Sequence, residues 1–278
     1  MAAPLSPLGQ QVRQQDHDRY LTVLFAPAEK REALFTLLAF NQEIARTAER
    51  VSEPLLGEMR LAWWRDALEA CAAGAKPPDH PLAAALAPLI AEGTLPAQAL
   101  LDQVEARRRD LDPEGFASLA EMTAYARETA GRLNALSATL LGRDDTRRAE
   151  AIGTAWGLVG QLRSYRAWLG SSRVWLPRDL LEQQGLSRQH LMENQGAVEL
   201  SVVADEVAGA AEALLAQAER AGRQIPRGAA SPYLLGSLAR LSFKRLRRAG
   251  NDLSAPAFIL PAPQRVFHLT WAAWRRRW

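Results

Sequence analysis

The sequence is poor in the residues that build disulfides and zinc sites. Its 278 residues contain one cysteine, Cys71, and four histidines that lie far apart, which excludes an internal disulfide and argues against zinc. Long apolar runs are also missing. The longest candidate, residues 151–162, is well short of the ~20 residues that cross a bilayer, so we expect no membrane-spanning segment.

A strong excess of either charge is missing as well. The chain has 34 Lys and Arg against 31 Asp and Glu, and a net charge of +3 does not favour nucleic acid as a partner. Arginine triplets stand at 107–109 and 275–277, and we expect the first triplet to be solvent-exposed on a helix. The N-terminus lacks a basic region followed by an apolar core, which predicts a cytoplasmic protein with residues 1–18 loosely ordered.

What the sequence does contain is apolar spacing typical of helices. Alternating apolar and polar runs, which would indicate strands, are scarce. We therefore predict an all-α fold, with residues 1–278 forming a single domain built as a bundle of long helices. The predicted helices cover residues 28–51, 55–74, 82–90, 96–110, 118–141, 146–169, a brief helix from about 179, 197–222, 232–249 and 263–278.

Four segments carry a resemblance to a known family. "YLTVLFAPAEKREALFTLLAFNQEIA", "RLAWWRDAL", "YARETAG" and "RVWLPRDLLEQQGL" occur in the order seen in squalene/phytoene synthases. The chain resembles that family over most of its length. The resemblance implies the all-α isoprenoid (terpenoid) synthase bundle, and a reaction that joins two prenyl diphosphates head to head through a cyclopropyl intermediate.

The family's reaction needs magnesium to neutralise a diphosphate leaving group, and magnesium prefers carboxylate oxygens. Two motifs of paired aspartates supply these ligands in the family. Here the first motif falls on Ala45 and Glu49 and the second on Ser164 and Trp168, and no acid lies anywhere in residues 162–174. We therefore expect neither a metal site nor a cofactor, with Mg²⁺ required only if the chain is a prenyltransferase.

Arginines beside these positions offer a different chemistry. Guanidinium groups can bind phosphate with two hydrogen bonds, which makes Arg46, Arg50, Arg163 and Arg166 candidates for anion binding. The alternative is that they are surface or ion-paired side chains. Glu49, which lies between two of them, could likewise act in catalysis or simply form a local ion pair.

Three aromatic residues match positions that, in the family, line the cavity of the fold or lie behind its wall. They are Tyr125, Trp63 and Trp64, and the alternative is that they are ordinary core residues.

The tail "LTWAAWRRRW" combines aromatic and basic residues. Its tryptophans are spaced by three and four positions, a pattern that suits a membrane interface or a partner protein. The alternative is a last helix whose tryptophans close the bundle. The residues concerned are Trp271, Trp274, Arg275, Arg276, Arg277 and Trp278.

Short motifs also point to one subgroup of the family. "FNQEIA", "VSEP", "LRSYR" and the final W-x-x-x-W resemble the mitochondrial complex I assembly factor 6 and its proteobacterial relatives. The resemblance implies a non-catalytic assembly factor for respiratory complex I, whose partners would be complex I subunits or other assembly factors.

Such a protein would be cytoplasmic or peripheral on the inner membrane, on the matrix side in a eukaryote, and could touch the membrane surface. Two alternative functions stay open. One is a head-to-head prenyltransferase acting on farnesyl or geranylgeranyl diphosphate, and the other is a carrier that binds an isoprenoid or lipid.

Overall fold

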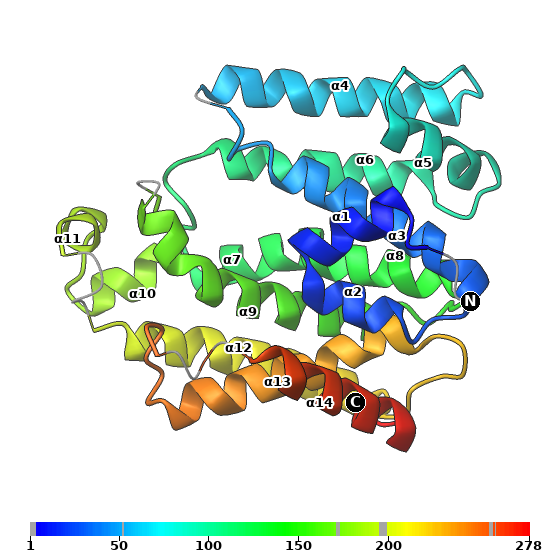
Figure 1. Cartoon of the computed structure of the whole chain (residues 1–278). Coiled ribbons are helices and arrows are strands. Elements are labelled where there is room, and N and C mark those ends of the chain that lie inside the picture. Colours follow the sequence, from blue (N-terminus) through cyan, green and yellow to red (C-terminus); the bar gives the residue numbers. More distant parts are fainter. Residues whose placement is uncertain (1–3, 52, 171–172, 195–198, 256–257, 259) are drawn as a thin grey trace.

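Helices make up nearly all the regular structure of the computed structural model, which describes residues 4–51, 53–170, 173–194, 199–255, 258 and 260–278 (Figure 1). The first half contains α1 (Pro7–Gln15), α2 (His17–Val23), α3 (Ala28–Ala45), α4 (Pro54–Ala72), α5 (Pro81–Ala91), α6 (Ala97–Ala106), the 3₁₀ turn η1 (Arg107–Leu111), α7 (Leu119–Ala126), the π turn η2 (Arg127–Gly131) and α8 (Arg132–Leu140). The second half contains α9 (Arg147–Gly170), α10 (Arg178–Gln183), α11 (Arg188–Glu193), α12 (Ser201–Arg220), α13 (Ala230–Arg248) and α14 (Ala262–Arg275). The predicted all-α class is confirmed.

The helices begin where the local sequence supplies a cap. The Ser6 hydroxyl accepts a hydrogen bond from the Gly9 amide at 3.0 Å, and Ser118 does the same for Glu121 at 3.2 Å. Proline occupies the first turn of α4 and α5, where no intrahelical donor is needed. These caps fix the helix starts that the sequence pattern leaves approximate.

The long helix α9 runs through the middle of the bundle, between α4 to α6 on one side and α12 to α14 on the other (Figure 1). It packs against α7, η2, α8, α12 and α13. One apolar cluster surrounds α9, α12 and α13, and a second joins α3 to α6 with α8. Tyr20 and Leu141 pack against both clusters, so the two are continuous.

Gly153 lets α9 lie close to the turn η2. A Cβ atom at this position would stand 2.5 Å from both the Ala130 carbonyl oxygen and the Asn134 Cβ. The backbone of η2 cannot move away without disturbing its own packing, so only glycine fits. Gly160 lies further along α9, and a Cβ added there would enter open space.

These two glycines predict opposite effects of the same substitution. Gly153→Ala is expected to lower the free energy of unfolding by about 1–3 kcal/mol through overpacking. Gly160→Ala is expected to raise it by about 0.5–1 kcal/mol, because alanine is the better helix former. Urea denaturation of both variants measures this, and equal stabilities would contradict the close approach of α9 and η2.

Two expectations about the chain differ from the structure. The segment expected to be loosely ordered forms α1 from Pro7 onward, and Val12 of this helix is completely buried. The helix predicted over residues 28–51 ends at Ala45, and the chain that follows forms turns. In those turns the Ala48 carbonyl accepts a hydrogen bond from Arg173 at 3.2 Å, which links them to the segment after α9.

Candidate functional site

The two positions predicted for the first family motif lie where α3 ends. Ala45 is the last residue of the helix and offers no ligand atom. Glu49 follows in the turns, and its side chain is 66% exposed and 3.6 Å from the Arg46 Nε. Because Glu49 lies beyond the helix, the two positions do not share the helical face that an i,i+4 metal site requires.

The two positions predicted for the second family motif lie near the end of α9. Ser164 is part-buried there and carries only a neutral hydroxyl. The backbone of Trp168 belongs to the same helix, but its side chain lies outside the described residues, as does that of Arg166. The side chains described at the four positions therefore do not fit magnesium. In the described part of the chain, no three acidic, His or Cys side chains gather as metal ligands.

The other candidate arginines contact carboxylates. Arg50 donates both of its hydrogen bonds from Nη1 to the Glu43 carboxylate, at 2.7 and 2.8 Å. Arg163 of α9 donates to Asp18 at 3.1 Å, and Arg265 of α14 donates to the other oxygen of that carboxylate at 2.6 Å. An anion at these arginines would have to compete with these ion pairs.

A buried polar cluster lies between α3, η1 and α7, and its centre is an arginine expected to be solvent-exposed. Arg107 donates to the Tyr125 hydroxyl at 2.8 Å and to Asn41 Oδ1 at 3.0 Å. It lies 3.4 Å from the Asp110 carboxylate, which also accepts the Tyr125 O–H. Arg173 donates to the Asp110 backbone carbonyl at 3.3 Å and thereby ties in the segment after α9.

Burial shapes the protonation of this cluster. It raises the pKa of the Asp110 carboxyl, with Arg107 and the Tyr125 hydroxyl opposing the rise. It also raises the pKa of Tyr125, which stays a neutral hydrogen-bond donor. The expectation that all of residues 107–109 are solvent-exposed is therefore wrong for Arg107. The signal for this lies in the spacing of Arg107 and Asp110, which a 3₁₀ turn places side by side.

The candidate aromatic residues fall in two separate places. Tyr125 is buried and lies 5.2 Å from Phe116 and 5.7 Å from Trp175, measured between ring centroids. Trp64 belongs to the other core cluster, while Trp63 beside it is 41% exposed. The structure therefore does not bring the α4 tryptophans and Tyr125 into one cavity wall.

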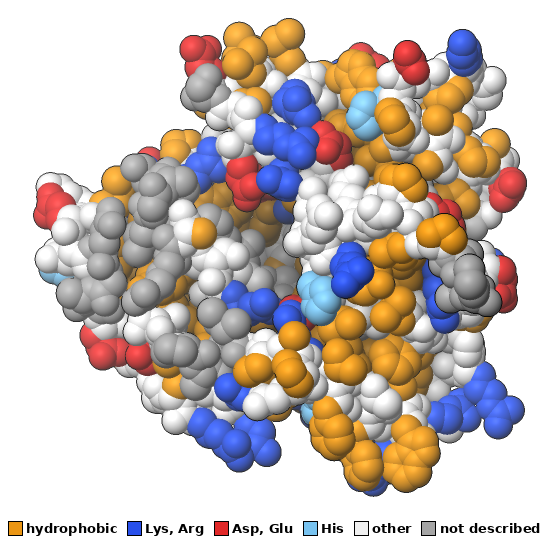
Figure 2. Space-filling model, in the orientation of Figure 1, with side chains coloured by type: hydrophobic (Ala, Val, Ile, Leu, Met, Phe, Trp, Pro, Cys, Tyr) orange, Lys and Arg blue, Asp and Glu red, His pale blue; other side chains and the backbone are white. Residues whose placement is uncertain are grey.

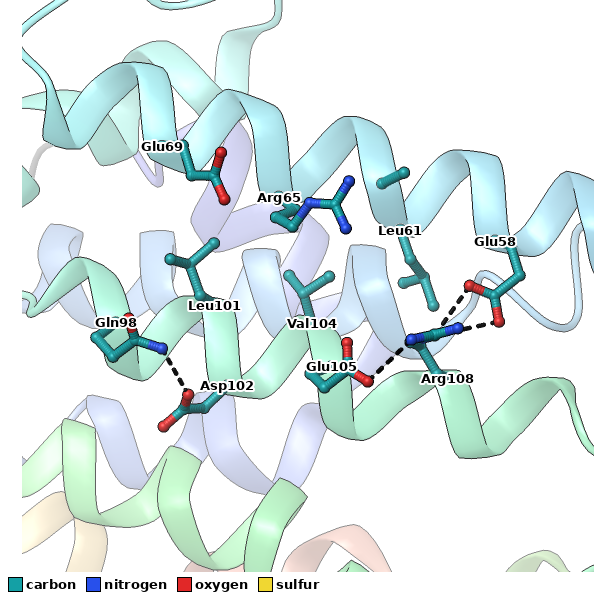
Figure 3. Close-up of a pocket in the computed structure, with 11 residues that line it drawn as sticks. Glu58, Leu61, Arg65, Glu69, Gln98, Leu101, Asp102, Val104, Glu105 and Arg108 are labelled. Atoms are coloured by element: carbon teal, nitrogen blue, oxygen red, sulfur yellow. Dashed lines mark hydrogen bonds and ion pairs between the residues drawn. The ribbon is translucent and has the colours of Figure 1, made fainter.

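Concave features of the described surface include a hollow and a groove between two helices. Figure 2 shows a hollow near the centre of one face, with basic side chains at its edges. A groove of about 410 Å³ lies between α4 and α6. Its floor is formed by Leu61, Leu101 and Val104, and at its rim Arg108 pairs with Glu58 and Glu105 (Figure 3).

Comparison with known proteins decides the family. The family model described as "Squalene/phytoene synthase" matches residues 12–275. The chain belongs to the squalene/phytoene synthase family. Its structure resembles that of a dehydrosqualene synthase with a TM-score of 0.80 at 17% identity, covering 96% of this chain and 94% of the other. This likeness confirms the isoprenoid synthase fold.

Two proteins with different names are similar to this chain over most of its length. The "NADH dehydrogenase (ubiquinone) complex I, assembly factor 6" of Mus musculus is 28% identical over 270 residues, covering 96% of this chain and 81% of that protein. The chloroplastic phytoene synthase 3 of Zea mays is 26% identical over 230 residues, covering 80% of this chain and 52% of that protein. In the described residues, no helix is both long and apolar enough to cross a membrane.

Proposed function

We propose that this chain is a non-catalytic assembly factor for respiratory complex I. The observation that carries the proposal is the similarity to complex I assembly factor 6 across 96% of the chain. The replaced ligand positions support it, because Ala45 and Ser164 cannot supply carboxylate oxygens and Glu49 pairs with Arg46 at the surface.

The proposed role works through protein contacts. Complex I subunits or other assembly factors are the proposed partners, and the proposed location is the surface of the inner membrane, on the matrix side in a eukaryote. The groove between α4 and α6 suits such a contact, because it combines an apolar floor with charged side chains at its rim (Figure 3).

A deletion strain tests the assembly role. We expect loss of NADH:ubiquinone oxidoreductase activity and of the assembled complex, with succinate dehydrogenase unchanged as the control. Expression of the intact chain should restore the activity. Expression of an Ala45→Asp, Ser164→Asp variant should restore it as well, since the proposed role needs no chemistry at these positions. Unaltered complex I activity in the deletion strain would reject the proposal.

Prenyl transfer is the second candidate function, favoured by the similarity to phytoene synthase 3 of Zea mays. It would require Mg²⁺, for which Ala45, Glu49 and Ser164 do not provide a site. Incubating the purified chain with farnesyl or geranylgeranyl diphosphate, Mg²⁺ and NADPH should release no pyrophosphate. Turnover at the rate of an ordinary synthase would establish this alternative, whereas tight binding without turnover would favour an isoprenoid or lipid carrier.

A further inference from the structure

The outer face of α14 carries large apolar side chains that nothing in the described chain covers. Phe267 is 71% exposed and Trp274 is 74% exposed, and Trp271 lies between them with its ring 5.3 Å from that of Trp274. The spacing of four and three residues places all three on one side of the helix. Figure 2 shows hydrophobic side chains gathered over the C-terminal end of α14.

A basic pocket adjoins this face. It lies between α13 and α14, has a volume of about 360 Å³, and shares Trp271 with the exposed face. Its floor is apolar, and among the residues that the structure describes no Asp or Glu lines it. The cations around it are Arg223, Arg240, Lys244, Arg275 and Arg277.

Several of these cations are available to a ligand. Arg223 and Arg240 contact the Glu219 carboxylate. Among the residues that the structure describes, Lys244, Arg275 and Arg277 form no ion pair. Arg275 instead covers the Trp271 ring, with its guanidinium carbon 5.6 Å from the ring centroid. Unpaired positive charge therefore stands directly beside exposed aromatic surface.

We propose that the α14 face, defined as Phe267, Trp271 and Trp274 together with Lys244, Arg275 and Arg277, binds the surface of a membrane that contains anionic phospholipid. Aromatic rings insert at the level of the headgroups, and each Lys or Arg near an anionic surface strengthens binding about fivefold. The apolar floor with a basic rim suits a phosphate headgroup attached to an acyl chain. A free anion would leave that floor without a partner.

The inference rests on the membrane-surface location in the proposed function and names the lipid class and the binding face. It is tested with the purified full chain and vesicles, which involve no complex I. The chain should sediment with vesicles of phosphatidylcholine and phosphatidylglycerol, and much less with phosphatidylcholine alone. Raising the salt concentration should weaken the binding, because the charges lie at the surface.

Matched variants assign the binding to this face. Phe267→Ser with Trp274→Ser should weaken vesicle binding at least about tenfold. Leu55→Ser with Met59→Ser, which removes comparably exposed apolar side chains from α4, should leave it unchanged. Lys244→Gln with Arg277→Gln should weaken binding about 25-fold, as expected for two surface cations. Unfolding curves that match the parent chain establish that each variant is folded.

Three outcomes would overturn the inference: no preference for phosphatidylglycerol, loss of binding in the α4 variant instead, or competition by inorganic phosphate at equal ionic strength. The last outcome would indicate a free-anion pocket. Failure here and failure of the assembly role are distinguishable. If the chain does not bind vesicles but restores complex I activity in the deletion strain, only the α14 inference is rejected.

Discussion

Arg107→Met is expected to lower the free energy of unfolding by about 3–5 kcal/mol, because it leaves a buried carboxylate without its counter-charge. The Arg107 side chain is only 11% exposed and that of Asp110 only 8%. The arginine also donates to Asn41 and Tyr125, so its removal leaves further buried acceptors unpaired. Methionine retains much of the apolar stem, which isolates the polar contribution.

The neighbouring arginine provides the control. Arg108 is 52% exposed and pairs with Glu58 and Glu105 at the rim of the α4–α6 groove. Arg108→Met should cost less than about 1 kcal/mol, as surface ion pairs do. Adding Asp110→Asn to Arg107→Met should recover part of the loss, since the buried charge is then removed. Equal costs at the two arginines, measured by urea denaturation, would show that the buried cluster does not stabilise the fold.

Trp278→Ala is expected to cost about 3–5 kcal/mol, the range typical of removing a buried aromatic side chain. Trp278 is only 3% exposed and its ring packs on α13 at Gly236, where any Cβ would collide with it. The Arg240 guanidinium covers the ring at 4.9 Å from its centroid. The chain reaches this position because Arg276 adopts a left-handed backbone conformation, with φ of 51°.

Trp274 is the matched control on the same tail. Because its side chain is largely exposed, Trp274→Ala should change the free energy of unfolding by less than about 0.5 kcal/mol. Vesicle binding by folded protein should show the reverse order. Trp274→Ala should weaken binding, whereas Trp278→Ala should not. Thermal or urea unfolding of the two variants checks the first half of this contrast. Similar stabilities would mean that Trp278 does not close the bundle.

The tail illustrates what the sequence could and could not predict. Periodicity predicted the helices, and α9, α12 and α13 lie within a few residues of their expected bounds. For the three tail tryptophans taken together, periodicity left two alternatives: contact with a membrane or partner protein, or closure of the bundle. The structure divides the group, because the chain turns at Arg276 and sends Trp278 back toward α13, while Trp271 and Trp274 stay on the outer side of α14. No helical pattern predicts a reversal made by an arginine.

The buried cluster shows the same limit at the candidate site. The segment containing Arg107 is charged, and charged segments are usually solvated, so its composition predicted exposure. Burial depends on Tyr125 and Asn41, which approach from other helices and supply the partners. The sequence predicted which positions replace the family motifs, and that assignment stays a prediction. That Glu49 would fall outside the helix could not be predicted, because the apolar spacing continues past Ala45 and the contact that Arg173 makes with the following turns comes from a distant segment.

Asp18 joins two regions that have been treated separately. Its carboxylate accepts from Arg163, next to the motif position Ser164 on α9, and from Arg265 on α14. One negative charge is therefore the shared counter-ion of α9 and of the proposed lipid-facing helix α14. A molecule that bound Arg163 would break its ion pair with Asp18. The Asp18 carboxylate would then pair with Arg265 alone, which would strengthen that second ion pair. If that molecule also changed the affinity of α14 for a membrane, reciprocity of binding free energies would require that membrane contact change the affinity for the molecule by the same factor.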